Sequence, residues 1–264
     1  MLLALDVGNT NITFGVFDDA HLFATWRIAS DREREPDEYA VIMLDLLRSR
    51  GLEPSQIHRA VLASGVPQLT AVVEEVCQRY FQVKPLRVGA GVRTGLKILY
   101  EDPREVGPDR IVDAVAALHM HKPPLIVVDL GTATVFDAVS AEGAYLGGAI
   151  APGIGLATEA LVQRAAMLRR VELVPPKTAI GSNTAAALQS GILFGYVELV
   201  EGLVRRFKAE LGANAWVVAT GGFASLIRRH TSVFDAVEPD LTLVGLRLVY
   251  EMNEAPAPGS SKEA

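Results

Sequence analysis

The sequence predicts an α/β protein made of two similar halves with a cleft between them. The main reason is a motif that occurs twice, 123 residues apart, in which an apolar strand ends in Asp, a hydrophobic residue, Gly and a polar residue. Its copies lie at residues 2–10 and 125–134. Two further observations agree with it: three strand patterns open each half, and helix patterns then follow around further apolar strands. The simplest interpretation is a duplicated phosphate-handling element.

In the first half, a polar turn at residues 18–20 separates two of three successive strand patterns, which favours an antiparallel meander. The next helix has a clear start and end. Pro36, Asp37 and Glu38 supply a proline and acidic residues for its first turn, and Gly51 stops it. The expected strands are 2–7, 11–17, 21–28, 59–64 and 83–88, and the expected helices are 37–50 and 68–80.

The second half begins with the same succession of three strands. The expected strands are 124–130, 133–139, 144–150 and 215–219, and the expected helices are 155–167 and 184–211. Trp26 and Trp216 fall in strand patterns, so we expect both indoles in the core. The repeat predicts domains at 1–118 and 119–252, and residues 253–264, rich in Ala, Pro, Gly and Ser, are expected to be disordered.

The composition is that of an ordinary soluble globular protein, because 50% of the 264 residues are hydrophobic and 21% are charged. The formal net charge of -6 argues against broad contact with nucleic acid or an anionic membrane, since both need a basic surface. Asp6 and Asp129 interrupt apolar runs, so we expect no signal peptide, no membrane-spanning helix and a cytoplasmic location. Cys77 is the only cysteine, and its helical pattern predicts a buried thiol.

The Asp and the Gly of the repeated motif have separate physical uses. Gly8 and Gly131 have no Cβ, so the backbone of the following turn can approach a phosphate and donate its N–H groups. Asp6 beside a phosphate would repel it, unless a divalent cation, most often Mg2+, or its bound water lies between them. One copy alone could be a strand end with a tight turn. The second copy and a third glycine-rich turn at residues 219–223 favour a nucleotide.

Residues 105–118 predict the start of a helix that carries a carboxylate in its first turn. Pro108 suits the first helical position, where its missing N–H matters least, so Asp109 and Arg110 follow within that turn. Two interpretations remain open. Asp109 either complements the helix dipole, an effect of about 0.3 to 1 kcal/mol, or it orients an alcohol as a base in phosphoryl transfer. In the second case Arg110 pairs with a carboxylate or phosphate oxygen of the substrate.

Together, the ordered motifs resemble the type III pantothenate kinases, a family of the acetate and sugar kinase, Hsp70 and actin superfamily. The resemblance covers nearly the whole chain. The segments that carry it are 6–11, 94–98, Tyr100, Pro103, 106–110, 129–134, 148–153, 180–184 and 220–222. It implies two duplicated actin-like ATPase (ribonuclease H-like) domains, each with a mixed sheet flanked by helices.

The resemblance also implies the reaction, which is transfer of the γ-phosphoryl group of ATP to the primary hydroxyl of pantothenate, the first step of coenzyme A synthesis. By similarity, Asp109 accepts the proton of that hydroxyl and Asp6 faces Mg2+ through water. Asp129 resembles the ligand of an activating monovalent cation, K+ or NH4+, although the residues alone would equally suit Mg2+. The implied ATP-binding residues are Asp6, Val7, Gly8, Asn9, Thr10, Asn11, Ile12, Thr13 and Thr132. The implied substrate-binding residues are Tyr100, Gly107, Pro108, Asp109, Arg110 and Thr184.

Members of this family are homodimers in which the partner subunit completes each pantothenate pocket. The helix after Thr184 offers a physical reason, because Ala187, Gly191 and Gly195 recur at every fourth position and let another helix approach closely. Packing between the two halves of one chain is the alternative. Three other functions stay open at this point: a kinase for another small molecule, a nucleotide-binding regulator and an actin-like filament protein.

Overall fold

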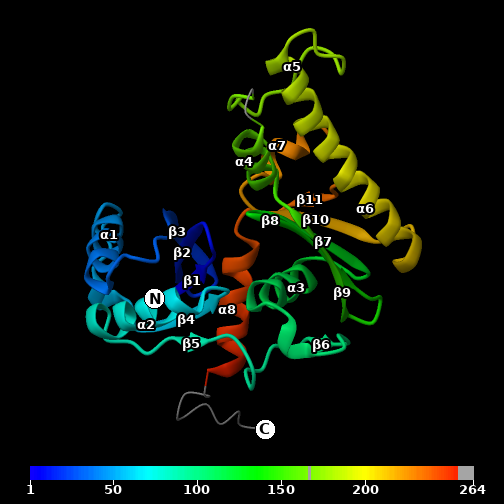
Figure 1. The fold of residues 1–264 in the computed structure, drawn as a ribbon. Helices are drawn as coiled ribbons and strands as arrows, with labels where there is room; N and C mark the ends of the chain where they lie inside the picture. Colours follow the sequence, from blue (N-terminus) through cyan, green and yellow to red (C-terminus); the bar gives the residue numbers. More distant parts are fainter. Residues whose placement is uncertain (166–167, 255–264) are drawn as a thin grey trace. The chain divides into compact units, whose positions relative to one another are not determined.

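The computed structural model describes residues 1–165 and 168–254, which form two compact units. Unit 1 holds residues 1–95, 104–116 and the chain from 242 onward, and unit 2 holds residues 96–103 and 117–241. Each unit has one mixed sheet flanked by helices (Figure 1). From residue 255 onward, the tail expected to be disordered lies outside the described residues, and the domain limit at residue 118 stays a prediction.

The sheet of unit 1 has five strands in the order β3-β2-β1-β4-β5 (Figure 1). The first three form the predicted antiparallel meander, and β4 and β5 continue the sheet in parallel with β1. The strands are β1 Leu2–Val7, β2 Asn11–Asp18, β3 His21–Ala29, β4 Arg59–Ser64 and β5 Leu86–Arg87. The predicted strand 83–88 is longer than β5, because only Leu86 and Arg87 pair with β4.

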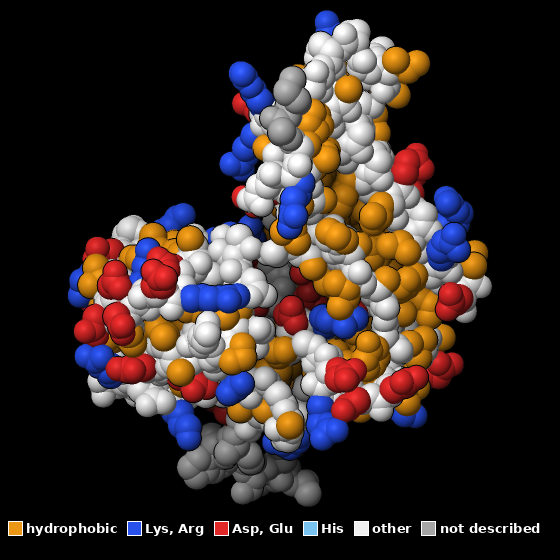
Figure 2. Space-filling model, viewed as in Figure 1, with side chains coloured by type: hydrophobic (Ala, Val, Ile, Leu, Met, Phe, Trp, Pro, Cys, Tyr) orange, Lys and Arg blue, Asp and Glu red, His pale blue; other side chains and the backbone are white. Residues whose placement is uncertain are grey.

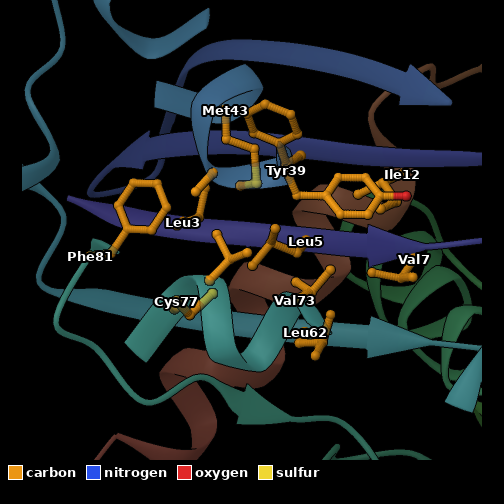
Figure 3. Packing of buried hydrophobic residues seen from close by; sticks show 14 of the residues in the cluster. Leu3, Leu5, Val7, Ile12, Tyr39, Met43, Leu62, Val73, Cys77 and Phe81 are labelled. Atoms are coloured by element: carbon orange, nitrogen blue, oxygen red, sulfur yellow. The ribbon is translucent and has the colours of Figure 1, made fainter. Parts of the chain in front are cut away.

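The core of unit 1 lies between its sheet and two helices. Period-2 alternation along β1 places Leu3, Leu5 and Val7 on one face, where Figure 3 shows them among side chains of α1 and α2, including Tyr39 and Cys77. Burial raises the pKa of the Cys77 thiol to about 12, so the predicted buried thiol is confirmed and is unreactive. The helices of this part of the chain are α1 Pro36–Arg48, η1 Pro54–Gln56, α2 Pro67–Tyr80, η2 Pro103–Glu105, α3 Pro108–Met120 and α8 Leu241–Asn253.

The last described helix, α8, returns to unit 1 after the whole of unit 2. It packs closely on two elements of unit 1. A Cβ on Gly245 would lie 2.0 Å from the carbonyl oxygen of Val112 in α3, and a Cβ on Gly15 in β2 would lie 2.9 Å from Leu243. Only glycine fits at position 245, where the neighbour is backbone, and Gly15 lets the Leu243 side chain approach β2, so α8 is an integral element of unit 1.

The sheet of unit 2 repeats that of unit 1 strand for strand. Its order, β11-β10-β7-β8-β9-β6, is the same succession read from the other edge, with β6 added beside β9. The strands are β6 Lys97–Ile98, β7 Leu125–Leu130, β8 Ala133–Val139, β9 Ala144–Pro152, β10 Trp216–Thr220 and β11 Ala236–Val237. The predicted duplication of the strand meander is therefore confirmed.

Register shows where the two copies differ. Leu5 lies opposite Phe14 in unit 1, and Val128 lies opposite Phe136 in unit 2. The first strands match at an offset of 123 residues and the second strands at 122. The loop after β7 is therefore one residue shorter than the loop after β1.

The helices of unit 2 cover its sheet around a long helical segment, residues 184–211, which contains one π-helical stretch. Tyr196, Val200 and Val204 line the buried side of that segment and pack on the core of unit 2. By length and composition alone this segment could cross a membrane, but one side of it packs on the core of unit 2. The helices are α4 Ile154–Arg164, α5 Thr184–Gln189, η3 Ser190–Phe194, α6 Gly195–Leu211 and α7 Ala224–Arg228.

The expectation for the two tryptophans is wrong for Trp216. This residue begins β10, remains 42% exposed and stacks on His121 with ring centroids 5.9 Å apart. A strand's first residue lies at the rim of the sheet, which explains the exposure. Trp26 is half-buried and stacks on Phe14 at the margin of the unit 1 core.

Candidate active site

The first copy of the motif forms a hairpin loop in unit 1. β1 brings Asp6 to its carboxyl end, and the Gly8 N–H donates to the Asn11 carbonyl at 3.0 Å, which closes the loop. Asn9 and Thr10 are exposed at its tip. A Cβ on Gly8 would lie 3.1 Å from the Asn11 carbonyl oxygen, so glycine eases this turn.

Of the residues predicted to bind ATP in this loop, two point away from solvent. Val7 and Ile12 have fully buried side chains in the core of unit 1. They can contribute only backbone groups to a ligand. Asp6 lies opposite Thr13 across the hairpin, and both are partly buried. The structure therefore brings together Asp6, Gly8, Asn9, Thr10 and Thr13 at one sheet end.

Sequence reasoning missed two residues that hold this loop. At the end of β3, the Ser30 hydroxyl donates to the Gly8 carbonyl at 2.6 Å, and the Ser30 N–H donates to the Thr10 carbonyl at 2.9 Å. The second residue is Arg32, whose Nη2 donates to Asn9 Oδ1 at 2.9 Å. No local motif marks these residues, because their contacts with the loop form only once β3 is paired in the sheet.

The second copy forms a tighter loop in unit 2. The Gly131 N–H donates to the Ala133 carbonyl at 3.0 Å, and the Gly153 N–H donates to the Thr132 carbonyl at 3.1 Å. A Cβ on Gly153 would lie 2.4 Å from both the Gly131 and Thr132 carbonyl oxygens. Thr132 is exposed at the loop tip and Asp129 is partly buried.

The third glycine-rich turn lies directly against the second copy. β10 pairs with β7 so that Thr220 lies opposite Asp129. Gly221 follows with a φ of 90°, and a Cβ there would lie 2.3 Å from an Asp129 carboxylate oxygen. The sequence predicted both elements, and the structure joins them into one site in unit 2.

Tyr196 of α6 is a buried tyrosine beside this second site. Burial chiefly raises its pKa to about 12, an interaction with the Ile154 backbone lowers it, and the negative charge of Asp129 adds to the increase. Its phenol therefore stays protonated at neutral pH. Sequence reasoning missed this residue because a tyrosine in a helical apolar stripe has the pattern of a core residue.

The predicted catalytic carboxylate begins α3 as expected. Pro108 is the first helical residue, and the Ile111 N–H donates to the Gly107 carbonyl at 3.2 Å. A Cβ on Gly107 would lie 2.4 Å from Asp109 Oδ1, so the carboxylate folds back over a position that only glycine leaves open. Asp109 is half-buried and Arg110 is buried.

The remaining substrate residues lie far apart within unit 2. Tyr100 follows β6 and covers Gly147, whose added Cβ would lie 3.1 Å from the Tyr100 ring. Thr184 is exposed at the start of α5, where Asn183 Oδ1 caps the helix by accepting from the Ala186 N–H at 2.9 Å. Figure 1 shows β6 and α5 at opposite ends of this unit. One copy of unit 2 therefore does not bring Tyr100 and Thr184 together.

Among the described residues, no three His, Cys, Asp or Glu side chains converge as a metal centre. A hollow of about 480 Å³ in unit 2 lies along α6, where Glu201, Arg205, Lys208 and Val233 contribute to its lining. None of the predicted site residues lines that hollow.

Comparisons with known proteins identify the family of this arrangement. Residues 2–206 match the family model described as type III pantothenate kinase. The type III pantothenate kinase of Moorella thermoacetica is 54% identical over 253 residues, which cover 96% of this chain and 100% of that protein. The one from Dehalococcoides mccartyi is 49% identical over 254 residues, with 96% and 98% covered.

Solved structures report on the fold alone. A candidate 2-dehydro-3-deoxygalactonokinase from Sinorhizobium meliloti matches with a TM-score of 0.60 at 12% sequence identity, covering 100% of both chains. The two sheets thus have the duplicated arrangement of actin-like sugar kinases.

Proposed function

This chain belongs to the type III pantothenate kinase family, and from that premise we propose which residues carry out its reaction. The reaction is the ATP-dependent phosphorylation of pantothenate in coenzyme A biosynthesis. The observation that carries the assignment of residues is the repeated hairpin, in which Asp6 and Asp129 are the next-to-last residues of the equivalent strands β1 and β7. The rival functions left open by the sequence are set aside by the family match.

Asp6 and its loop receive the phosphates of ATP. Asn9 and Thr10 are exposed at the loop tip, and the carboxylate of Asp6 suits Mg2+, which keeps several waters and takes few protein ligands. The absence of a three-residue metal cluster among the described residues agrees with that mode of binding. When bound, Mg2+ would offset negative charge on the phosphates. Asp6 would then hold the ion through water rather than meet a phosphate directly.

Asp109 orients the primary hydroxyl of pantothenate and accepts its proton. The dissociative character of phosphoryl transfer demands little proton abstraction until late, so an ordinary carboxylate suffices. Gly107, which has no Cβ, leaves open the space that this carboxylate occupies at the start of α3. Arg110 follows it and is suited to pair with the pantothenate carboxylate, because a guanidinium binds carboxylates through two parallel hydrogen bonds.

Asp129 holds the activating monovalent cation, K+ or NH4+. Its oxygen ligands and the nearby backbone carbonyls of the tight loop suit a hard cation. Gly221 leaves room beside the carboxylate. Thr132, exposed at the loop tip, would contact the nucleotide. The neighbouring phenol of Tyr196 stays neutral and adds no second negative charge.

A homodimer completes the pantothenate site. Tyr100 and Thr184 lie at opposite ends of unit 2, so a partner subunit is a direct way to unite their roles. Figure 2 shows many apolar side chains on the visible face of unit 2. The exposed large hydrophobic residues of this unit include Ile150, Leu156 and Ile180. Such surface favours association. We expect a two-subunit mass in solution and a cytoplasmic enzyme.

The decisive experiment measures ATP-dependent phosphorylation of pantothenate by the wild type and by Asp109→Asn, with K+ or Na+ as the only monovalent ion. We expect the variant to lose at least about a hundredfold in kcat, the lower range for a positioned base. We also expect little wild-type activity in Na+. Unchanged kcat in a folded Asp109→Asn variant would refute the role of this carboxylate, and equal rates in both salts would refute the cation site.

A further inference from the structure

The end of β3 controls the orientation of backbone groups in the first loop. The Ser30 hydroxyl binds the Gly8 carbonyl at 2.6 Å, and its N–H binds the Thr10 carbonyl at 2.9 Å. The Gly8 N–H in turn binds the Asn11 carbonyl at 3.0 Å. Three carbonyl groups of this loop are thereby occupied by donors from the protein.

This arrangement determines the direction of a peptide N–H. In a planar trans peptide the C=O and the N–H point to opposite sides. Because Ser30 holds the Gly8 carbonyl, the Asn9 N–H points away from Ser30. Asn9 is exposed, and its N–H donates to no other described residue. Phosphate oxygens are attracted by N–H groups and repelled by carbonyl oxygens. The loop therefore points the Asn9 N–H toward a phosphate and the Gly8 carbonyl away from it.

The support behind Ser30 reaches the core of unit 1. The Tyr39 hydroxyl accepts from the Asp31 N–H and donates to the Asp31 carbonyl, both at 2.8 Å. Tyr39 is fully buried. Arg32 then holds the Asn9 side chain through its oxygen at 2.9 Å. Residues 30–32 therefore form a brace that links a rigid core residue to the exposed loop.

We propose that Ser30 is a positioning residue for ATP: its hydroxyl fixes the Gly8–Asn9 peptide so that the Asn9 N–H faces a phosphate oxygen. Arg32 restrains Asn9 further by holding its side-chain oxygen. This inference rests on the proposed role of the Asp6 loop in binding ATP. Neither Ser30 nor Arg32 needs to contact the nucleotide.

The test compares Ser30→Ala, Ser30→Thr and Arg32→Ala with a matched control. Ser49 makes the same kind of bond, from its hydroxyl to the Leu46 carbonyl at 2.6 Å, at the end of α1 and away from the loop. Ser49→Ala therefore removes an equivalent bond. For each variant, KM for ATP, KM for pantothenate, kcat and the unfolding temperature are measured.

We expect Ser30→Ala to raise KM for ATP about three- to tenfold, the effect of one lost hydrogen bond. KM for pantothenate should stay within about twofold, and Ser30→Thr should restore most of the ATP affinity because it keeps the hydroxyl. Ser49→Ala should leave KM for ATP unchanged. Arg32→Ala, at an exposed position, should raise KM for ATP by a smaller factor even if Ser30→Ala folds poorly.

Two results would overturn the inference: an unchanged KM for ATP in both Ser30→Ala and Arg32→Ala, or the same rise in Ser49→Ala. Asp6→Asn separates this failure from a failure of the proposed function. If Asp6→Asn impairs ATP use and the Ser30 and Arg32 variants do not, only the brace is wrong. If all three are without effect, the loop itself does not bind ATP.

Discussion

The two copies of the hairpin loop are held by different residues at one equivalent position, which is Ser30 in unit 1 and Gly153 in unit 2. Both follow the third strand of their meander, 123 residues apart, and both donate an N–H to the loop, to the Thr10 carbonyl at 2.9 Å and the Thr132 carbonyl at 3.1 Å. Ser30 also has a hydroxyl that binds the Gly8 carbonyl. At Gly153 the corresponding carbonyl, that of Gly131, lies 2.4 Å from where a Cβ would be.

The difference follows from loop length. With one residue fewer, the second loop draws its carbonyl groups onto the end of β9 and leaves no space for a side chain. Unit 1 braces its loop with side chains, whereas unit 2 uses close backbone packing and the turn at Gly221. In the proposed assignment, one duplicated scaffold thus serves as a loop for phosphates in unit 1 and as a tighter loop for a cation in unit 2. Three experiments test this contrast.

The largest effect is expected for Gly153→Ser, which gives the second copy the residue of the first. Its Cβ would collide with two backbone carbonyl oxygens that cannot move without shifting the loop. We expect the free energy of unfolding to fall by about 3 kcal/mol, at the upper end for overpacking, as measured by denaturant titration. Gly89→Ala is the control, because a Cβ there meets no atom within 4 Å. Equal stability of the two variants would mean that the loops tolerate the same residue.

A smaller effect, on catalysis, is expected for Asp6→Asn and Asp129→Asn. Each variant removes one charged group that is proposed to bind a cation. We expect each to lower kcat/KM for ATP about ten- to a hundredfold. The contrast predicts different rescues: raised Mg2+ should recover part of the Asp6→Asn activity, and Asp129→Asn should lose the difference between K+ and Na+. Rates titrated against each ion decide this. Identical ion responses of the two variants would contradict separate roles for the two loops.

The smallest effect is expected for Gly8→Ala and Gly131→Ala. A Cβ at Gly8 lies 3.1 Å from the Asn11 carbonyl oxygen, whereas at Gly131 the closest atoms, at 3.5 Å, are at ordinary contact distance. We expect Gly8→Ala to lower the unfolding free energy by under about 1 kcal/mol. Gly131→Ala should be neutral or slightly stabilising, because alanine restricts the unfolded chain. Thermal unfolding without ATP measures both, and the reverse order would show that the second loop is the tighter one at its glycine as well.

Much of the fold could be predicted because its signals are local. Strand alternation, the turn at 18–20, Pro36 and Pro108 gave element positions within a few residues, and the repeated motif gave the duplication. The position of α8 could not be predicted, since its packing depends on Gly15 and Gly245 meeting distant partners. The expectation that Trp216 is buried failed for a related reason. A strand pattern in the sequence does not show which residue begins the strand and therefore lies at the rim of the sheet.

The candidate site was predictable where a single residue type has one chemical use. Asp6, Gly8 and Asp129 were found from their order in the motif, and Gly221 from its glycine pair. Ser30, Arg32 and Tyr196 act through contacts that the chain forms only after folding. Their residue types are common, so no spacing distinguishes them before the strands are in register.

The return of α8 to unit 1 has a consequence for biosynthesis. Unit 2 ends at residue 241, so a nascent chain has all of unit 2 before α8 has left the ribosome, while the sheet of unit 1 still lacks the helix that packs at Gly15. The amino-terminal half, although made first, is therefore completed last. A chain halted before α8 would leave apolar surface of unit 1 uncovered, which makes premature termination near residue 240 a direct route to aggregation.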